Sequence, residues 1–398
     1  MVRVVVASDK FKGSLTSAEV AAAVGAGVRR ACPDATVVAV PVADGGDGTL
    51  AAAVGAGFVL VPVVASGPTG EPVKSGYARQ GDTAVVELAD VSGLVRLPGG
   101  VPAPLTATSY GTGELIAAAV DAGCTRIILG IGGSASTDGG AGLIAALTRG
   151  VPTDPDRPAQ PAHFGGLTPQ RAGSTPRIPT GKGPFEGLTP QMVGRLEGVE
   201  VVVACDVDNP LTGARGAAAV YGPQKGATAE QVSELDGKLS AWADLVAEHT
   251  GRDLRDALGA GAAGGVGFAA LSLLGAELRP GIELVLEMVG FDEQLAGADL
   301  VITGEGALDE QTLHGKAVAG VAAKAAGIPV VAVCGVNRLE PHQLREAGVR
   351  AAYALTDLEP DVQRCIAEPK PLLEQLGERI AVEHLTMTGR REASDERS

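Results

Sequence analysis

The sequence predicts an α/β protein with a doubly wound parallel sheet, interrupted by a second, inserted α/β domain. Short apolar runs alternate with helix-length segments at the start of the chain, and this alternation returns near its end. The middle of the chain differs in composition, with alanine-rich helices and one proline-rich stretch. A length of 398 residues exceeds what one ordinary hydrophobic core needs, so two domains are expected.

The first segments give the clearest local signals. Residues 2–7 are a continuous apolar run rich in β-branched side chains, which is typical of a strand buried on both faces. Thr16 and Glu19 have the spacing of a capping box, so we expect a helix that ends near Ala31. A strand, a helix and a strand should follow at residues 36–43, 49–55 and 58–64. This order predicts parallel pairing with right-handed crossovers.

The end of the chain repeats this order. Strands are expected at residues 299–303, 328–335 and 349–355, with a helix at 314–327. We therefore assign residues 1–72 and 291–386 to one discontinuous domain, and residues 73–290 to the inserted domain.

The inserted domain should contain strands at residues 83–89, 126–130 and 199–205, and helices at 113–122 and 228–250. Residues 151–190 hold nine of the 25 prolines and lack periodicity, so we predict that they are irregular or disordered. The polar residues 387–398 are expected to form a frayed tail.

Composition limits the partners. The net charge of −15 and the aromatic content of 3% argue against nucleic acid, because duplex binding needs a basic face and single-strand binding needs aromatic platforms. Five widely spaced cysteines fit reduced thiols in a cytoplasmic protein. The chain reaches Asp9 too early for a signal peptide, and the glycines of residues 259–276 favour a buried loop and helix over a membrane span.

Charged residues lie in glycine-rich turns that directly follow apolar runs. Four such turns occupy residues 8–14, 43–49, 130–140 and 303–306. Glycine lets the backbone approach a ligand and aim N–H groups at it, while Asp and Lys supply proton transfer, metal ligation and anion binding. The pattern predicts a site for a phosphorylated ligand beyond the carboxyl ends of the strands, in a cleft between the domains.

Each turn has an alternative interpretation. Asp9, Lys10 and Lys12 could form a solvated connection, although two lysines beside a helix N-terminus suit an anion. The turn that contains Asp44 could be structural, or it could hold a metal ion or accept a hydroxyl proton. Around Ser134 the chain fits a dinucleotide pattern without the expected acidic partner, and it lacks the final glycine of a nucleophile elbow. A phosphate cradle suits these residues better.

Three later segments also bear chemistry. Residues 206–213 follow a strand and could be an Asx turn. Lys225 precedes a helix and could simply be a surface lysine. Glu305, Asp309 and Lys316 cluster after the strand at 299–303, where carboxylates can hold Mg²⁺ with phosphate oxygens. The chain has neither a Walker A pattern nor a protein-kinase signature.

Taken together, these motifs resemble the type I glycerate kinases. The resemblance rests on residues 8–15, 41–49, 130–142, 204–213, 222–227, 261–267 and 299–316, in the family's order. It implies ATP- and Mg²⁺-dependent phosphorylation of D-glycerate, usually to the 2-phospho isomer. It also implies a flavodoxin-like domain interrupted by a domain with a restriction-endonuclease-like fold, and it leaves a homodimer open. Residues 151–190 depart from the family pattern.

Our hypothesis for the site follows residue type and position. Catalysis is assigned to Asp206, Asp44 and Lys10, with Asp206 or Asp44 as the base. Contacts to substrate or phosphate are assigned to Asp9, Lys12, Gly132, Gly133, Ser134, Asp138, Asn209, Lys225 and Lys316. Glu305 and Asp309 are assigned to Mg²⁺. The rival interpretations are a dinucleotide-dependent oxidoreductase and a binding protein without turnover.

Overall fold

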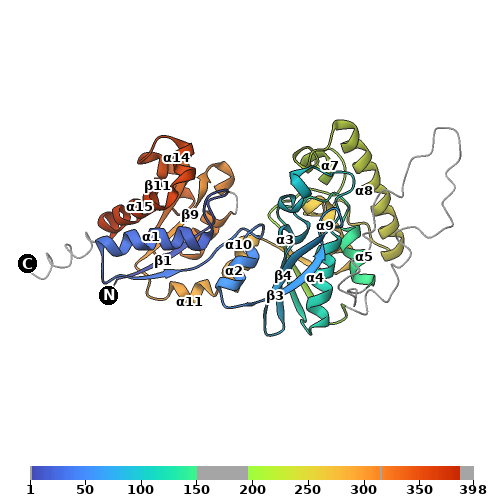
Figure 1. Cartoon of the computed structure of the whole chain (residues 1–398), viewed down its shortest axis with the longest axis horizontal. Coiled ribbons are helices and arrows are strands. Elements are labelled where there is room, and N and C mark those ends of the chain that lie inside the picture. The colour runs from blue at the N-terminus through green and yellow to red at the C-terminus, as the bar shows by residue number, and fades with distance from the viewer. Residues whose placement is uncertain (1, 150–195, 314–315, 386–398) are drawn as a thin grey trace, which may run out of the picture. The chain divides into compact units, whose positions relative to one another are not determined.

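The computed structural model describes residues 2–149, 196–313 and 316–385 (Figure 1). The segment 151–190 and the tail 387–398 therefore lie outside the described residues. Contacts divide the chain into two units. The first contains residues 1–44, 51–57 and 280–398, and the second contains residues 45–50 and 58–279.

The first unit is built on a sheet of five parallel strands. Its order is β11-β10-β9-β1-β2. The strands are β1 (Arg3–Ser8), β2 (Thr36–Ala39), β9 (Leu300–Leu308), β10 (Val330–Asn337) and β11 (Ala351–Ala354). β1 and β9 come from opposite ends of the sequence and pair in register, so the two terminal segments share one sheet.

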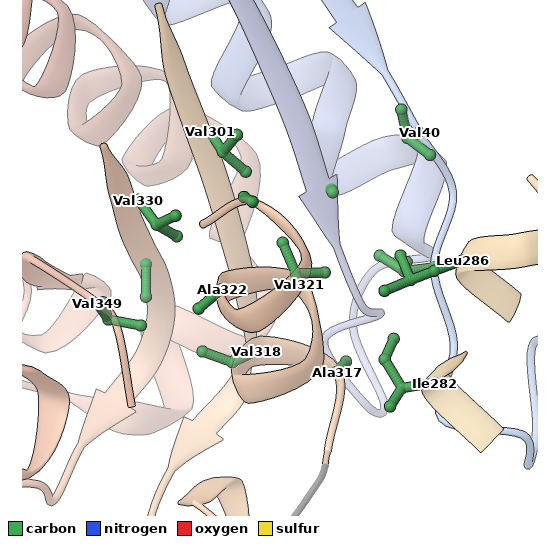
Figure 2. Close-up of a cluster of buried hydrophobic side chains, with 14 of the residues drawn as sticks. Val40, Ile282, Leu286, Val301, Ala317, Val318, Val321, Ala322, Val330 and Val349 are labelled. Atoms are coloured by element: carbon green, nitrogen blue, oxygen red, sulfur yellow. The ribbon is translucent and has the colours of Figure 1, made fainter. Parts of the chain in front are cut away.

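Helices cover both faces of this sheet. They are α1 (Ser17–Ala31), α2 (Thr49–Gly55), α10 (Gly281–Met288), α11 (Phe291–Leu295), α12 (Ala317–Lys324), α13 (Pro341–Glu346), α14 (Val362–Ala367) and α15 (Pro369–His384). Val5 of β1 belongs to a core with α10 and α12, whereas Val4 belongs to a second core with α1 and α15. Figure 2 shows Val318 and Val321 of α12 in the first of these cores. Successive residues of β1 thus face opposite cores, so the strand is apolar on both sides, as predicted from residues 2–7.

Helices α1 and α15 lie side by side at close range (Figure 1). A Cβ atom added to Gly27 would lie 1.9 Å from the carbonyl oxygen of Glu374. Likewise, a Cβ atom added to Gly377 would lie 2.2 Å from the carbonyl oxygen of Val24. The two glycines thus allow direct backbone contact between the helices. The predicted capping box of Thr16 and Glu19 begins α1.

The second unit contains a mixed six-stranded sheet. Its order is β3-β4-β5-β6-β7-β8. The strands are β3 (Val59–Ser66), β4 (Pro72–Gln80), β5 (Thr83–Glu87), β6 (Arg126–Gly130), β7 (Glu200–Ala204) and β8 (Glu277–Arg279). The pairs β3–β4 and β4–β5 are antiparallel, and the remaining pairs are parallel.

The helices of the second unit are α3 (Ala89–Ser92), α4 (Tyr110–Asp121), α5 (Ala141–Arg149), α7 (Ala217–Tyr221), α8 (Ala229–Thr250) and α9 (Ala262–Leu273). α4, α5 and α9 pack on the sheet, while Trp242 of α8 lies in a separate core. Short 3-10 helices occupy Leu94–Arg96, Pro98–Gly100 and Pro223–Lys225, and in the first unit Glu310–Leu313 and Leu355–Asp357. No helix among the described residues is long and apolar enough to cross a membrane.

Two sequence-based predictions about strands are wrong. The strand expected at residues 58–64 does not extend the first sheet, because β3 pairs with β4 as an antiparallel hairpin of the second sheet. The assignment of residues 58–72 to the first domain therefore fails with it. Residues 303–306 are not a turn either. They lie within β9, because β10 continues to Asn337 and pairs with Glu305, Ala307 and Leu308 beyond the end of β1.

The close contact of α1 and α15 predicts a large penalty for a methyl group at Gly27. Gly27→Ala should lower the free energy of unfolding by about 2 kcal/mol or more, because backbone atoms must shift to admit it. Gly237→Ala in α8 is the matched control, since an added Cβ meets nothing within 4 Å and should stabilise by about 0.5–1 kcal/mol. Urea unfolding followed by circular dichroism measures both. Equal effects of the two substitutions would contradict the packing.

Candidate functional site

Asp9 stands at the carboxyl end of β1, in the first unit. Its backbone N–H donates to the carbonyl oxygen of Gly304 on β9 at 2.8 Å, which ties it to the neighbouring strand. Its Oδ1 accepts the backbone N–H of Lys10 at 2.7 Å and lies 3.9 Å from the Lys10 Nζ. The side chain of Lys12 is exposed, and its backbone lies beside Gly306.

The negative charges near Asp9 are only partly compensated. Burial raises the pKa of Asp9 to about 6; Lys10 opposes this shift, while the charges of Asp44 and Glu305 add to it. Burial also raises the pKa of Glu305, and Asp309 and Asp44 act in the same direction. Asp9, Asp44 and Glu305 therefore interact electrostatically within this unit. A cation would relieve the repulsion among these carboxylates.

A short turn follows Glu305. Glu305 Oε1 accepts the Thr312 hydroxyl at 2.6 Å, and Asp309 Oδ1 accepts the backbone N–H of Gln311 at 2.9 Å. Lys316 donates from Nζ to the side-chain oxygen of Gln311 at 2.9 Å, and its charge opposes the raised pKa of Glu305. Asp309 thus closes the turn that orients Thr312 and Lys316 around Glu305.

The carboxylates of this unit fit a magnesium ion in chemistry. Carboxylate oxygens are the hard ligands that Mg²⁺ prefers, and one or two of them suffice when phosphate oxygens and water complete the shell. Within the described ranges no cluster of three or more His, Cys, Asp or Glu side chains is close enough to hold a metal alone. Such a site would therefore depend on a phosphorylated ligand.

In the second unit, a glycine-rich loop follows β6. Gly132 packs against the turn at residues 44–48, since a Cβ atom added to it would lie 2.6 Å from the Gly46 Cα. The backbones of Gly133 and Ala135 pair with residues 92–94 through bonds of 3.0 Å. Much of the predicted phosphate cradle is thus held by other parts of the protein.

Lys225 is buried, not the surface lysine of the alternative interpretation. Its Nζ donates to the Ser134 hydroxyl at 2.8 Å and to the carbonyl oxygen of Ser136 at 2.5 Å. Burial lowers its pKa to about 7, against the opposing charge of Asp138. The structure therefore brings together Ser134, Lys225 and Asp138.

Both carboxylate oxygens of Asp138 accept hydrogen bonds. It accepts the backbone N–H groups of Ser109, Gly140 and Gly142 at 2.8–3.2 Å, and the hydroxyls of Thr108 and Ser109. These bonds fix the start of α5. In this conformation Asp138 fastens the loop and has no evident capacity for a further ligand.

The hydroxyls of Ser136 and Thr137 complete this loop. Both oxygens are buried and, within the described chain, have no hydrogen-bond partner. Buried polar atoms are normally satisfied, so two orphaned hydroxyls beside Lys225 fit a ligand with phosphate oxygens. Neither residue was singled out from the sequence, although both lie in the turn at 130–140.

The loop after β7 bears Asp206 and Asn209. Asp206 is exposed. Asn209 accepts the Tyr221 hydroxyl at 2.6 Å and donates to the carbonyl oxygen of Arg215 at 2.9 Å, so its side chain is committed to the loop. Since β6 and β7 pair up to Gly130 and Ala204, both loops leave the same edge of the second sheet.

Sequence analysis missed Glu87, the last residue of β5. It is 5% exposed, and its Oε2 accepts the backbone N–H groups of Gly48 at 3.2 Å and Leu50 at 2.9 Å. Burial raises its pKa to about 7, and the charges of Asp47 and Asp90 add to the shift. The available signal was an acidic residue directly after an apolar run, which also marked Asp9 and Asp206.

The raised pKa of Asp9 predicts a pH-dependent effect of Asp9→Asn. The pKa of the Asp9 carboxyl is about 6 in the folded protein and 3.8 in the unfolded chain. Ionisation therefore favours the unfolded chain, and the folded protein loses stability as the pH rises from 3.8 through 6. Without metal, the substitution should have little effect below pH 4 and stabilise by about 3 kcal/mol above pH 7.

Urea titrations in EDTA measure this difference. They are followed by circular dichroism and not by fluorescence, because the single tryptophan lies in the second unit and Asp9 lies in the first. The exposed Asp34→Asn is the control and should show no such pH dependence. A constant effect of Asp9→Asn from pH 4 to 8 would contradict the assignment.

Comparisons with known proteins agree over almost the whole chain. A model of the glycerate kinase family matches residues 4–385. The glycerate kinase of Bacillus subtilis (strain 168) is 44% identical over 363 residues, which cover 89% of this chain and 90% of that protein. The glycerate 2-kinase of Escherichia coli (strain K12) is 41% identical over 359 residues, with 89% and 90% covered.

The fold is also similar to a solved structure. A crystal structure from Salmonella typhimurium LT2, provisionally assigned as a glycerate kinase 2, has 38% identity and a TM-score of 0.75. The similarity covers 98% of this chain and 99% of that one. With the family match and the curated relatives, it shows that the chain belongs to the glycerate kinase family.

Proposed function

We propose that this protein transfers the γ-phosphoryl group of ATP to D-glycerate and forms a phosphoglycerate, with the 2-phospho isomer as the expected product. The observation that carries the proposal is that the family match spans every loop to which we assigned a role. The loops that follow β1, β6 and β7 stand at the carboxyl ends of parallel strands, where α/β proteins bind ligands.

The chemistry requires two anions to approach each other. Positive charge and hydrogen-bond donors must offset their repulsion, and the acceptor hydroxyl must lose its proton as the phosphoryl group moves. We assign donors for phosphate or carboxylate to Lys10, Lys12 and Lys316 in the first unit, and to Ser134 and Lys225 in the second. The orphaned hydroxyls of Ser136 and Thr137 support a role of this loop in phosphate binding.

Magnesium is assigned to the first unit. Glu305 would be its principal protein ligand, and Asp309 would act beside it. When bound, the ion would neutralise negative charge on the phosphate oxygens. The mutual repulsion of Asp9, Asp44 and Glu305 supports this assignment.

The finer description of the folds is also a proposal. When the inserted strands are left out, the order β2-β1-β9-β10-β11 is the 2-1-3-4-5 order of flavodoxin-like sheets. This supports a flavodoxin-like first unit. The restriction-endonuclease-like description of the second unit rests on the family resemblance.

The activity is tested by incubating the protein with Mg-ATP and D-glycerate and recording the phosphorus NMR spectrum of the product. A new phosphate-ester signal is expected, and its coupling to the carbon-bound protons identifies the phosphorylated hydroxyl. Absence of turnover by folded protein would refute the proposal. Change of an NAD(P) absorbance without ATP would favour the oxidoreductase interpretation.

The assignment of the base predicts the effect of Asp206→Asn. If Asp206 accepts the hydroxyl proton, this change should lower kcat by at least about a hundredfold. Asp208→Asn is the matched control, because Asp208 is also exposed in this loop and pairs with Arg215 at 3.1 Å. Its kcat should stay within about threefold of the wild type. Near-normal turnover of Asp206→Asn, with a large loss in Asp44→Asn, would transfer the role to Asp44.

A further inference from the structure

The turn at residues 44–48 is rich in glycine. It contains Gly45, Gly46 and Gly48, and Gly45 and Gly48 have positive φ values of 84° and 101°. Glycine loses more conformational entropy on ordering than any other residue. A fixed position for Asp44 and Asp47 therefore requires contacts from outside the turn.

Two such contacts come from the backbone. Gly46 packs on Gly132. The carbonyl oxygen of Gly45 packs on Gly130, since a Cβ atom added to Gly130 would lie 2.8 Å from this oxygen. Thr49 adds a local bond from its hydroxyl to the carbonyl oxygen of Gly46 at 2.7 Å. These contacts set the distance of the turn from the β6 loop, but they include no charged group.

Glu87 supplies the charged contact. One oxygen, Oε2, accepts N–H groups on both sides of Thr49, from Gly48 and from Leu50. Glu87 is itself fixed, because it pairs with Gly130 in the sheet and the next N–H, of Leu88, donates to the carbonyl oxygen of Gly130 at 2.9 Å. The same strand pair thus bears both the Glu87 carboxylate and the start of the glycine-rich loop.

The burial of Glu87 is otherwise unexplained. Among the described residues it forms no ion pair, and the charges acting on it, Asp47 and Asp90, are negative. An apolar side chain would avoid the desolvation of a carboxyl group. The two hydrogen bonds from the backbone N–H groups of Gly48 and Leu50 offset this cost.

We propose that Glu87 is a positioning residue: it fixes residues 45–50 against the glycine-rich loop and thereby orders the segment that directly follows Asp44 for phosphoryl transfer. This inference rests on the proposed function only in its last step. The ordering of the turn by Glu87 is a structural claim that needs no substrate.

The first experiment measures order in the turn by amide hydrogen exchange, followed on the peptide that spans residues 44–52. Glu87→Ala removes the acceptor and should speed exchange in this peptide by about tenfold or more, because the Gly48 and Leu50 amides lose their partner. Glu87→Gln keeps an oxygen acceptor and should remain close to the wild type. Glu87→Met keeps the volume without an acceptor and replaces Glu87→Ala if that variant does not fold.

Glu114→Ala is the matched control. Glu114 is also 5% exposed in the second unit, its pKa is also raised by burial, and its Oε2 accepts the backbone N–H of Ser66 at 2.6 Å. Fluorescence of Trp242, buried in the same unit, measures the stability of both variants. Glu114→Ala should destabilise the unit without speeding exchange at residues 44–52.

The second experiment compares the kinetics with D-glycerate. Glu87→Ala should lower kcat by at least about tenfold with a smaller change in KM, since misplacement of a reacting group raises the barrier more than it weakens binding. Glu87→Gln and Glu114→Ala should stay within about threefold of the wild type.

The outcomes separate the two proposals. Unchanged exchange in Glu87→Ala, or equal exchange in Glu87→Ala and Glu114→Ala, would overturn the positioning role. Faster exchange limited to Glu87→Ala, in a protein that does not phosphorylate D-glycerate, would support the ordering of the turn and refute the kinase activity. Faster exchange with unchanged kcat would overturn the link from the turn to catalysis.

Discussion

The second unit depends on a small number of buried charged side chains that fix backbone segments too rich in glycine to fix themselves. Glycine permits the close approach of the loop after β6 to its neighbours, but it contributes no side chain to hold the arrangement. Asp138 fixes one end of the loop, Lys225 fixes its middle, and Glu87 fixes the turn packed against it. Each of these groups is desolvated, so each must be satisfied by several hydrogen bonds.

The first unit uses charge differently. Asp9 follows β1 and Glu305 lies within β9; desolvation raises the pKa of both carboxyls, and neighbouring carboxylates add to each shift. An arrangement of this kind is destabilising in the free protein and becomes favourable when a cation binds. The carboxylates at this sheet edge thus destabilise the free protein, whereas in the second unit the buried charges stabilise loops.

Local signals made much of the fold predictable. The capping box of Thr16 and Glu19 involves residues three apart, and α1 begins where this pair predicts. The sheet to which β3 belongs depends on its pairing with β4, and the extent of β9 depends on the length of β10, so neither was visible in a local pattern. The partners of Glu87 lie 37 and 39 residues away in sequence, which is why its role emerged only from the structure.

The contrast between the units bears on the choice of base. Asp44 is a like charge near Asp9 and Glu305, and it adds to the raised pKa of both carboxyls. A cation bound by Glu305 would offset this repulsion. Asp206 belongs to the other unit. The two candidate bases therefore differ in their surroundings, since Asp44 interacts with two carboxylates of the first unit and Asp206 is exposed in the loop after β7.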